Sequence, residues 1–155
     1  MKLIAHRGLV DGPNKELENK PEQIKSALKL GFDCEIDVRY VYGAWFLGHD
    51  GPMYPIDYEF LEQPGLWIHA KNLEALYVLG ADAKLNFFWH QEDDFTLTSQ
   101  GYIWTYPGKP LTTQSVCVMP EWDKELDLTT FKPDCYGICS DYVRDLLQTA
   151  TGQNP

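Results

Sequence analysis

The chain has 155 residues, of which 44% are hydrophobic and 14% aromatic, so it can bury the core of one globular domain and is not intrinsically disordered. Its formal net charge of −10 argues against a nucleic-acid-binding protein, which normally carries a basic face. The same charge repels anions, so an anionic ligand needs a local positive site.

The sequence predicts a cytoplasmic protein. The segment before His6 is too short for a secretory signal, and no apolar run reaches the length of a membrane span. The four cysteines fall mostly in strand-like segments, so we expect buried free thiols rather than disulfides.

Short apolar segments alternate with helical ones, a pattern typical of α/β folds with largely parallel strands. The expected strands are residues 2–5, 33–40, 66–70, 85–89, 102–105, 115–119 and 136–139, with a further short strand at 44–47. The expected helices are residues 21–30, a turn or two within 56–62, a helix between Asn72 and Gly80, and a last helix from Asp141 to Leu147.

The later strands are joined by connections of only about ten residues, barely enough for a helical crossover. A complete TIM barrel needs at least about 200 residues. We therefore expect a reduced or incomplete TIM-type β/α barrel of about seven strands with several helices missing. The competing architecture is an open doubly wound sheet, but no Gly-x-Gly-x-x-Gly follows the first strand. Residues 1–150 are expected to form one domain and residues 151–155 a frayed tail.

Histidines follow strand-like segments throughout the chain. One such histidine is usually structural, but four in the same topological position favour a shared site, because catalytic groups project from strand ends in α/β folds. The four are His6, His49, His69 and His90.

Glu35 and Asp37 lie two residues apart on one strand, so both side chains point to the same face. The opposite face is apolar, which directs the acidic pair into the mouth of the barrel. Two like charges there are costly without a compensating cation or guanidinium. The pair predicts a Mg²⁺ or Ca²⁺ site. The alternative is an ordinary solvated strand face.

Several short motifs together resemble the glycerophosphodiester phosphodiesterase family. The resemblance covers about residues 3–71 and 136–147, with Lys20 where the family usually has Thr and His69 where it usually has Glu. The matching segments are His6-Arg7-Gly8, Leu17-Glu18-Asn19-Lys20-Pro21, Glu35-Ile36-Asp37-Val38, His49-Asp50, Ile68-His69-Ala70-Lys71 and Gly137-Ile138-Cys139-Ser140-Asp141-Tyr142.

The resemblance implies a phospholipase-like β/α barrel that hydrolyses a small glycerophosphodiester-like substrate with a divalent cation. By this resemblance Glu35 and Asp37 are metal ligands, and His69 occupies the third ligand position. The paired histidines of the family map to His6 and His49, as general base and general acid, although which is which stays open. The phosphate-holding residues of the family map to Arg7 and Lys71.

The residues themselves agree with this chemistry, since histidines of ordinary pKa can transfer protons near neutral pH and cations can neutralise phosphate oxygens. Imidazole in place of a carboxylate at position 69 softens the site, so Mn²⁺ or Zn²⁺ should bind comparatively better than Mg²⁺ or Ca²⁺. The alternatives are that His69 is not a ligand, or that the enzyme is degenerate.

Five more residues are candidates for a supporting or substrate-contacting role. We prefer a hydrogen-bonding role for Glu121 over metal ligation, and Trp104 is either an apolar wall of the site or part of the core. Asp141 is interpreted as a helix cap rather than a catalytic residue. The five candidates are Glu18, Arg39, His90, Trp104 and Glu121.

The leading hypothesis is a metal-dependent phosphodiesterase. Its rival is a catalytically degenerate barrel that binds a phosphoester or phosphoglycan, and a third option is a lyase-like enzyme that stops at a cyclic phosphate. A barrel with missing helices exposes apolar strand faces, which makes a homodimer a further expectation.

Overall fold

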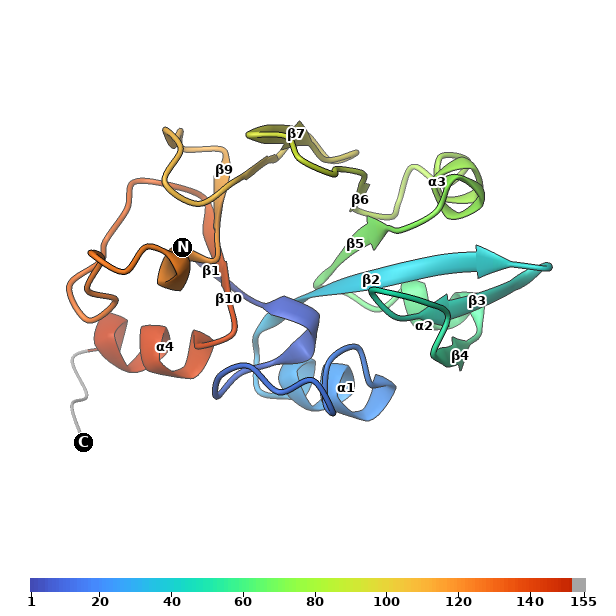
Figure 1. The fold of residues 1–155 in the computed structure, drawn as a ribbon, viewed down its shortest axis with the longest axis horizontal. Helices are drawn as coiled ribbons and strands as arrows, with labels where there is room; N and C mark the ends of the chain where they lie inside the picture. The colour runs from blue at the N-terminus through green and yellow to red at the C-terminus, as the bar shows by residue number, and fades with distance from the viewer. Residues whose placement is uncertain (152–155) are drawn as a thin grey trace.

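Figure 1 shows a computed structural model of the chain, which describes residues 1–151 as a mixed α/β protein. The strands are β1 (Lys2–Ala5), β2 (Asp33–Val41), β3 (Ala44–Leu47), β4 (Tyr54–Ile56), β5 (Leu66–Ala70), β6 (Phe87–Phe88), β7 (Phe95–Leu97), β8 (Ile103–Thr105), β9 (Ser115–Val118) and β10 (Gly137–Ser140). The helices are α1 (Pro21–Lys29), α2 (Tyr58–Leu61), α3 (Leu73–Leu79) and α4 (Val143–Thr151), with short 3₁₀ turns η1 (His6–Gly8) and η2 (Pro120–Trp122).

The sheet curls into an incomplete barrel (Figure 1). Seven strands run parallel in the spatial order β8, β9, β10, β1, β2, β5, β6. At the open side, Ser99 links the segment after β7 to β6: its amide donates to the carbonyl of Phe87 at 2.8 Å, and its hydroxyl accepts from the amide of Phe87 at 2.9 Å. The α/β fold expected from the sequence, with about seven parallel strands, is confirmed.

Helices cover only one part of the curled sheet. The crossover from β1 to β2 contains α1, the one from β5 to β6 contains α3, and α4 follows β10. Within residues 1–151, the connections from β6 to β8, from β8 to β9 and from β9 to β10 contain no α-helix. Leu128 and Phe131, from the last of these connections, pack instead on Cys117 and Ile138. The expectation of several missing helices is therefore met.

Strand alternation separates the outer core beneath the helices from an inner cluster inside the curl. On β2, Cys34, Ile36 and Val38 face the helices and are fully buried in the outer core. Inside the curl, six parallel strands each contribute one apolar residue to an inner cluster, whereas β2 contributes Glu35 and Asp37. The inner residues are Ile4, Trp67, Phe88, Trp104, Val116 and Cys139. The inward direction predicted for the acidic pair is confirmed.

The sequence missed two short antiparallel strands and misjudged some boundaries. β4 contains Pro55, which a strand accommodates here because β4 lies at the edge of the sheet. The strand expected at 85–89 is reduced to Phe87–Phe88, since β5 pairs with only these two residues. α4 extends to Thr151, which was expected to begin a frayed tail, and residues 152–155 of that expected tail lie outside the described residues.

Among residues 1–151, no helix has both the length and the apolar composition needed to cross a membrane. The four cysteines carry free thiols; Cys135 is half-buried and the other three are buried.

Candidate functional site

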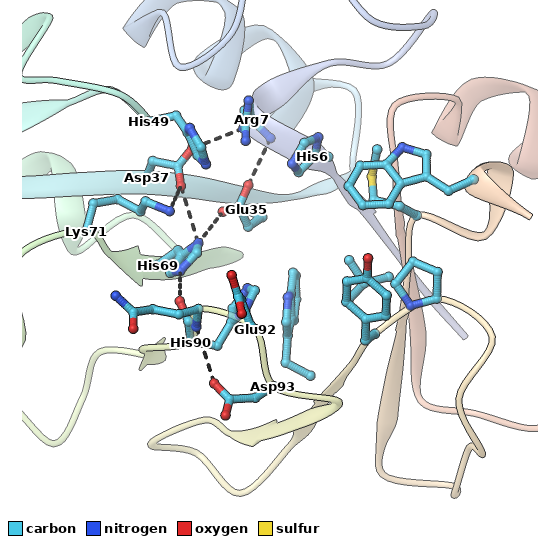
Figure 2. A pocket seen from close by; sticks show the side chains of 17 residues that line it. His6, Arg7, Glu35, Asp37, His49, His69, Lys71, His90, Glu92 and Asp93 are labelled. Carbon is cyan, nitrogen blue, oxygen red and sulfur yellow. Dashed lines mark hydrogen bonds and ion pairs between the residues drawn. The ribbon is translucent and has the colours of Figure 1, made fainter.

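A cleft of about 810 Å³ opens at the carboxyl ends of the parallel strands (Figure 2). All four histidines line it, together with the acidic pair of β2 and the two cations predicted to hold phosphate. These residues are His6, Arg7, Glu35, Asp37, His49, His69, Lys71 and His90. Five of the eight lie at or just beyond the carboxyl ends of β1, β5 and β6; Glu35 and Asp37 lie within β2, and His49 follows β3, which pairs antiparallel with β2. The fold thus brings to one cleft the histidines and carboxylates that the sequence predicted to share a site.

Sheet register explains why the acidic pair meets His69. In the parallel ladder, Glu35 lies beside Trp67 and Asp37 lies beside His69, all on the inner face. Nδ1 of His69 is 3.6 Å from Oε1 of Glu35 and 3.3 Å from Oδ1 of Asp37. One donor atom from each of these three buried residues lies within 4.8 Å of the others. This three-residue cluster is the candidate metal centre.

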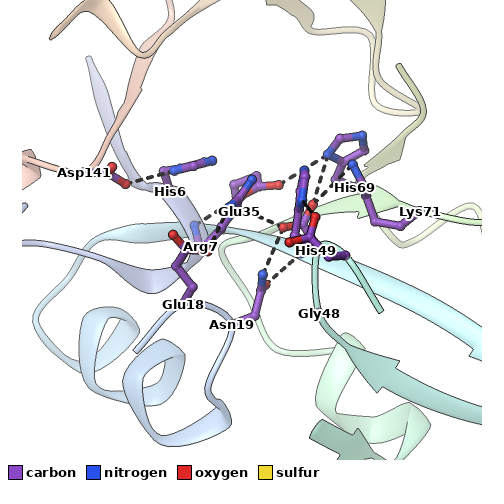
Figure 3. Close-up of polar contacts among 12 residues, drawn as sticks. His6, Arg7, Glu18, Asn19, Glu35, Gly48, His49, His69, Lys71 and Asp141 are labelled. Carbon is purple, nitrogen blue, oxygen red and sulfur yellow. Dashed lines mark hydrogen bonds and ion pairs between the residues drawn. The ribbon is translucent and has the colours of Figure 1, made fainter. Parts of the chain in front are cut away.

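Asp37 is the most enclosed member of the cluster, with no exposed surface. Its Oδ2 accepts a hydrogen bond from Nδ2 of Asn19 at 2.9 Å, and its backbone amide donates to Oδ1 of Asn19 at 2.9 Å (Figure 3). Nε of Arg7 lies 3.1 Å from the same Oδ2, and Nζ of Lys71 lies 3.9 Å from Oδ1. Burial acts to raise the pKa of Asp37, but contact with His69 and the charge of Arg7 hold that pKa well below its usual value.

Arg7 is held in place by carboxylates at the edge of the cleft. Its backbone adopts a left-handed conformation, with φ of 52°, and its amide donates to Oε2 of Glu35 at 3.1 Å. Its Nη1 donates to Oε2 of Glu18 at 2.8 Å, and Nε faces Asp37 as described above. The supporting role predicted for Glu18 is therefore to fix Arg7. Arg7 itself stays 17% exposed at its side chain, on the cleft.

The ring of His69 is fixed by two stacked neighbours and at its outer nitrogen. It stacks on Phe88 at 4.9 Å and on His90 at 4.6 Å between ring centroids, and its Nε2 lies 3.3 Å from the carbonyl oxygen of His90. If Nε2–H donates to that carbonyl, the neutral ring presents the lone pair of Nδ1 to Glu35 and Asp37. Burial and the charge of His69 lower the pKa of His90 to about 4. His90 thus supports His69 through its ring and backbone.

The residues of the cluster fit a divalent cation. A neutral Nδ1 lone pair that faces two carboxylate oxygens is repulsive unless a positive charge lies between them, and Oδ1 of Asp37 is buried with no hydrogen-bond partner in the described structure. Metal-ligating histidines usually donate their other N–H to a carbonyl or carboxylate, as His69 is placed to do. Without a metal, proton uptake by His69 would satisfy the same oxygens, and burial, which lowers its pKa, is outweighed by its contacts with Asp37 and Glu35, which raise it.

His6 forms a buried pair with Asp141. Nδ1–H of His6 donates to Oδ1 of Asp141 at 2.9 Å, and the two side chains are 15% and 9% exposed (Figure 3). Burial acts to lower the pKa of His6, but this bond and the charge of Glu35 raise that pKa above its usual value. The sequence interpretation of Asp141 as a helix cap missed the main contact of its carboxylate. That contact is with His6, which lies 135 positions away in the chain.

Glu121 holds the segment that carries Asp141. Its Oε1 accepts from the hydroxyl of Ser140 at 2.8 Å and from the amide of Asp141 at 2.9 Å, whereas its Oε2 is buried without a partner among the described residues. The hydrogen-bonding role preferred for Glu121 is confirmed. Glu121 of η2 thus holds the backbone of Asp141 at the end of β10, and Asp141 in turn holds the ring of His6.

The raised pKa of His6 predicts a pH-dependent loss of stability on Asp141→Asn. Below about pH 6.5 His6 is protonated in both states, so the ion pair contributes fully; its contribution is lost as the pH rises through the folded-state pKa. We expect the variant to lose about 2 kcal/mol of unfolding free energy at pH 5.5 and clearly less at pH 9, by urea unfolding of chelator-treated protein. Asp145→Asn, at an exposed position of α4, is the matched control; equal losses for Asp141→Asn at both pH values contradict the prediction.

His49 lies on a tightly constrained turn after β3. Its Nδ1 bonds Oδ1 of Asp50 at 2.7 Å. Arg39 donates from Nε to the carbonyl of Gly48 at 3.2 Å and from Nη2 to the carbonyl of His49 at 2.6 Å, which gives this candidate a positioning role. Gly48 has φ of 145°, and a Cβ there would lie 2.1 Å from the carbonyl oxygen of Gly51. Only glycine fits, and the turn keeps His49 on the cleft.

The far wall of the cleft contains the predicted residue Trp104 and three residues that the sequence did not single out. Trp104, buried at 5% exposure, is both a core residue and a wall residue, so the two alternatives for it are not exclusive. Tyr106, Met119 and Trp122 line the same wall. They follow β8 and β9 at the same edge of the sheet as the histidines. Knowing exactly where these two strands end would have identified them from the sequence.

No family model, curated protein or solved structure that we compared with the chain matches it. The function is therefore argued from the geometry of the cleft.

Proposed function

We propose that this protein is a metal-dependent phosphodiesterase that hydrolyses a glycerophosphodiester-like substrate, related to the glycerophosphodiester phosphodiesterase family and built on a shortened TIM-type barrel. One observation carries the proposal. A single cleft brings two carboxylate-bound histidines together with a buried Glu–Asp–His cluster and with Arg7 and Lys71. Phosphodiester cleavage needs these three elements: a proton acceptor, a proton donor, and positive charge beside the phosphate oxygens.

Glu35, Asp37 and His69 would hold the divalent cation. When bound, such an ion neutralises charge on the phosphate oxygens and lowers the pKa of a coordinated hydroxyl or water. With one imidazole and two carboxylates, the donor set suits Mn²⁺ or Zn²⁺ as well as Mg²⁺ or Ca²⁺.

We assign proton abstraction to His6 and proton donation to His49. The buried carboxylate of Asp141 fixes Nδ1 of His6, leaves Nε2 to face the cleft, and stabilises the imidazolium that forms when Nε2 takes a proton. His49, whose side chain is 38% exposed, can regain its proton from solvent after giving it to the leaving alcohol. The amino group of Lys71 neutralises a phosphate oxygen, since Asp37 contacts it only at 3.9 Å.

Hydrolysis of bis-p-nitrophenyl phosphate and of glycerophosphocholine, with Mg²⁺, Ca²⁺, Mn²⁺ or Zn²⁺ added to chelator-treated protein, tests the proposal. We expect turnover of both substrates that requires a divalent cation and is lost on Glu35→Gln. Turnover that is unchanged by chelator, or absent with all four ions, contradicts it.

A second candidate function is phosphoester binding without turnover. Its support is the contact of His69 with both carboxylates, because a protonated His69 occupies the place of a cation. Calorimetry in the presence of chelator separates the two functions, since the binding module retains its affinity for glycerophosphocholine without metal.

A further inference from the structure

The two walls of the cleft differ in chemistry (Figure 2). One wall carries the charged cluster, from the middle of β2 and the carboxyl ends of β1 and β5. The opposite wall, formed at the ends of β8 and β9, is apolar and aromatic. Its residues are Trp104, Tyr106, Pro107, Val118, Met119 and Trp122.

Two of these aromatic side chains remain open to solvent. Trp122 is 58% exposed and Tyr106 is 47% exposed, while Trp104 and Met119 of the same wall are buried. Large apolar side chains exposed together at the rim of a cleft are characteristic of a ligand-binding surface. Because the phosphate-directed residues lie across the cleft, this aromatic wall faces one of the two alcohols of a bound diester.

The shape of the wall restricts what that alcohol can be. The recess between Trp104, Tyr106 and Val118 holds about 20 Å³, room for about one water molecule, so the wall has no deep apolar pocket into which an acyl chain could insert. The aromatic residues come from one side only, whereas a quaternary ammonium group is usually enclosed by several aromatic faces. A one-sided platform suits a flat ring that lies against it.

Polar groups border the platform. Gln91, Glu92 and Asp93 line the same cleft and are exposed, so their oxygens are available to accept hydrogen bonds from hydroxyl groups. An apolar surface for one ring face, beside acceptors for hydroxyls at the ring edge, matches a sugar.

Given the proposed function, on which this inference rests, we propose that the aromatic wall is a subsite for a sugar ring and that the substrate is a glycerol phosphodiester of a sugar. Hydrolysis breaks the P–O bond to the sugar oxygen and forms one to the oxygen of water. One proton of the water ends on the sugar hydroxyl and the other is released from the phosphate monoester.

Three diesters that share glycerol phosphate and differ in the second alcohol test the subsite. The second alcohol is methyl glucoside, esterified through O6, in the first diester, choline in the second and methanol in the third. In the wild type we expect the highest kcat/KM for the sugar diester. In Trp122→Ala and Tyr106→Ala the ratio of kcat/KM for the sugar diester to that for the methyl diester should fall about tenfold, as expected for loss of one stacking face. Tyr77→Ala, at an 82% exposed position of α3 outside the cleft, should change neither rate.

An unchanged ratio in both cleft variants, or a wild type that prefers the choline diester, overturns the sugar subsite while leaving the phosphodiesterase proposal intact. If the wild type hydrolyses none of the three, the proposed function fails. The subsite is then decided by calorimetry: tighter binding of the sugar diester than of the methyl diester, lost in Trp122→Ala, supports it, and equal binding overturns it.

Discussion

Replacing His6 with alanine is expected to lower kcat for phosphodiester hydrolysis about 10³-fold, whichever alcohol leaves. The reason is the buried bond between Nδ1 of His6 and Asp141, which fits His6 to accept the proton of the attacking group. Proton removal from the nucleophile is needed for every leaving group. The loss should therefore be similar for bis-p-nitrophenyl phosphate and for glycerophosphocholine, measured at saturating Mn²⁺.

His49→Ala is the matched variant. In the proposed mechanism the proton from His49 is needed when a poor leaving group, such as the alkoxide of choline, departs, but p-nitrophenolate is a stable anion that leaves without protonation. We expect a loss of about 10²-fold or more with glycerophosphocholine and a much smaller one with bis-p-nitrophenyl phosphate. If the two variants show the reverse pattern, His49 is the proton acceptor and His6 the proton donor. If neither variant loses activity, neither histidine takes part in the mechanism.

Much of the fold and site could be predicted because local patterns decide them. Alternation along β2 places Glu35 and Asp37 on the inner face whatever the details of the barrel, since the opposite face must meet the helices. Likewise Pro21 and the buried positions Ile24 and Ala27 specify α1 almost to its boundaries.

The remainder depends on contacts that no local pattern encodes. Asp141 has the residue type and position of a helix cap, and only the pairing of β10 with β1 brings it to His6. Trp122 reaches the cleft because a 3₁₀ turn replaces a helical crossover after β9, and β7 is too short to show a period. Long-range pairing and irregular connections therefore account for most of what the sequence missed.

Replacing Asp37 with alanine is expected to cost about 3 kcal/mol of unfolding free energy at neutral pH, the largest structural effect of any substitution in the cleft. Asp37 is fully buried, and its loss leaves the side-chain amide of Asn19 without its acceptor and removes the carboxylate that forms an ion pair with the guanidinium of Arg7. Urea unfolding of chelator-treated protein measures the change, with an unchanged m-value as the sign of two-state behaviour.

Glu35→Gln separates this structural role from metal binding. The amide retains an oxygen that can accept from the amide of Arg7, so we expect a fold close to wild type, but the site loses one anionic ligand. At about a hundredfold excess over Kd, Mn²⁺ should stabilise the wild type by about 2.7 kcal/mol and stabilise Glu35→Gln far less. If Asp37→Ala is as stable as the wild type, the contacts of Asp37 with Asn19 and Arg7 do not stabilise the fold. Equal stabilisation of the wild type and Glu35→Gln by Mn²⁺ excludes the Glu–Asp–His cluster as the metal site, because ions bound elsewhere on this acidic surface would act on both proteins alike.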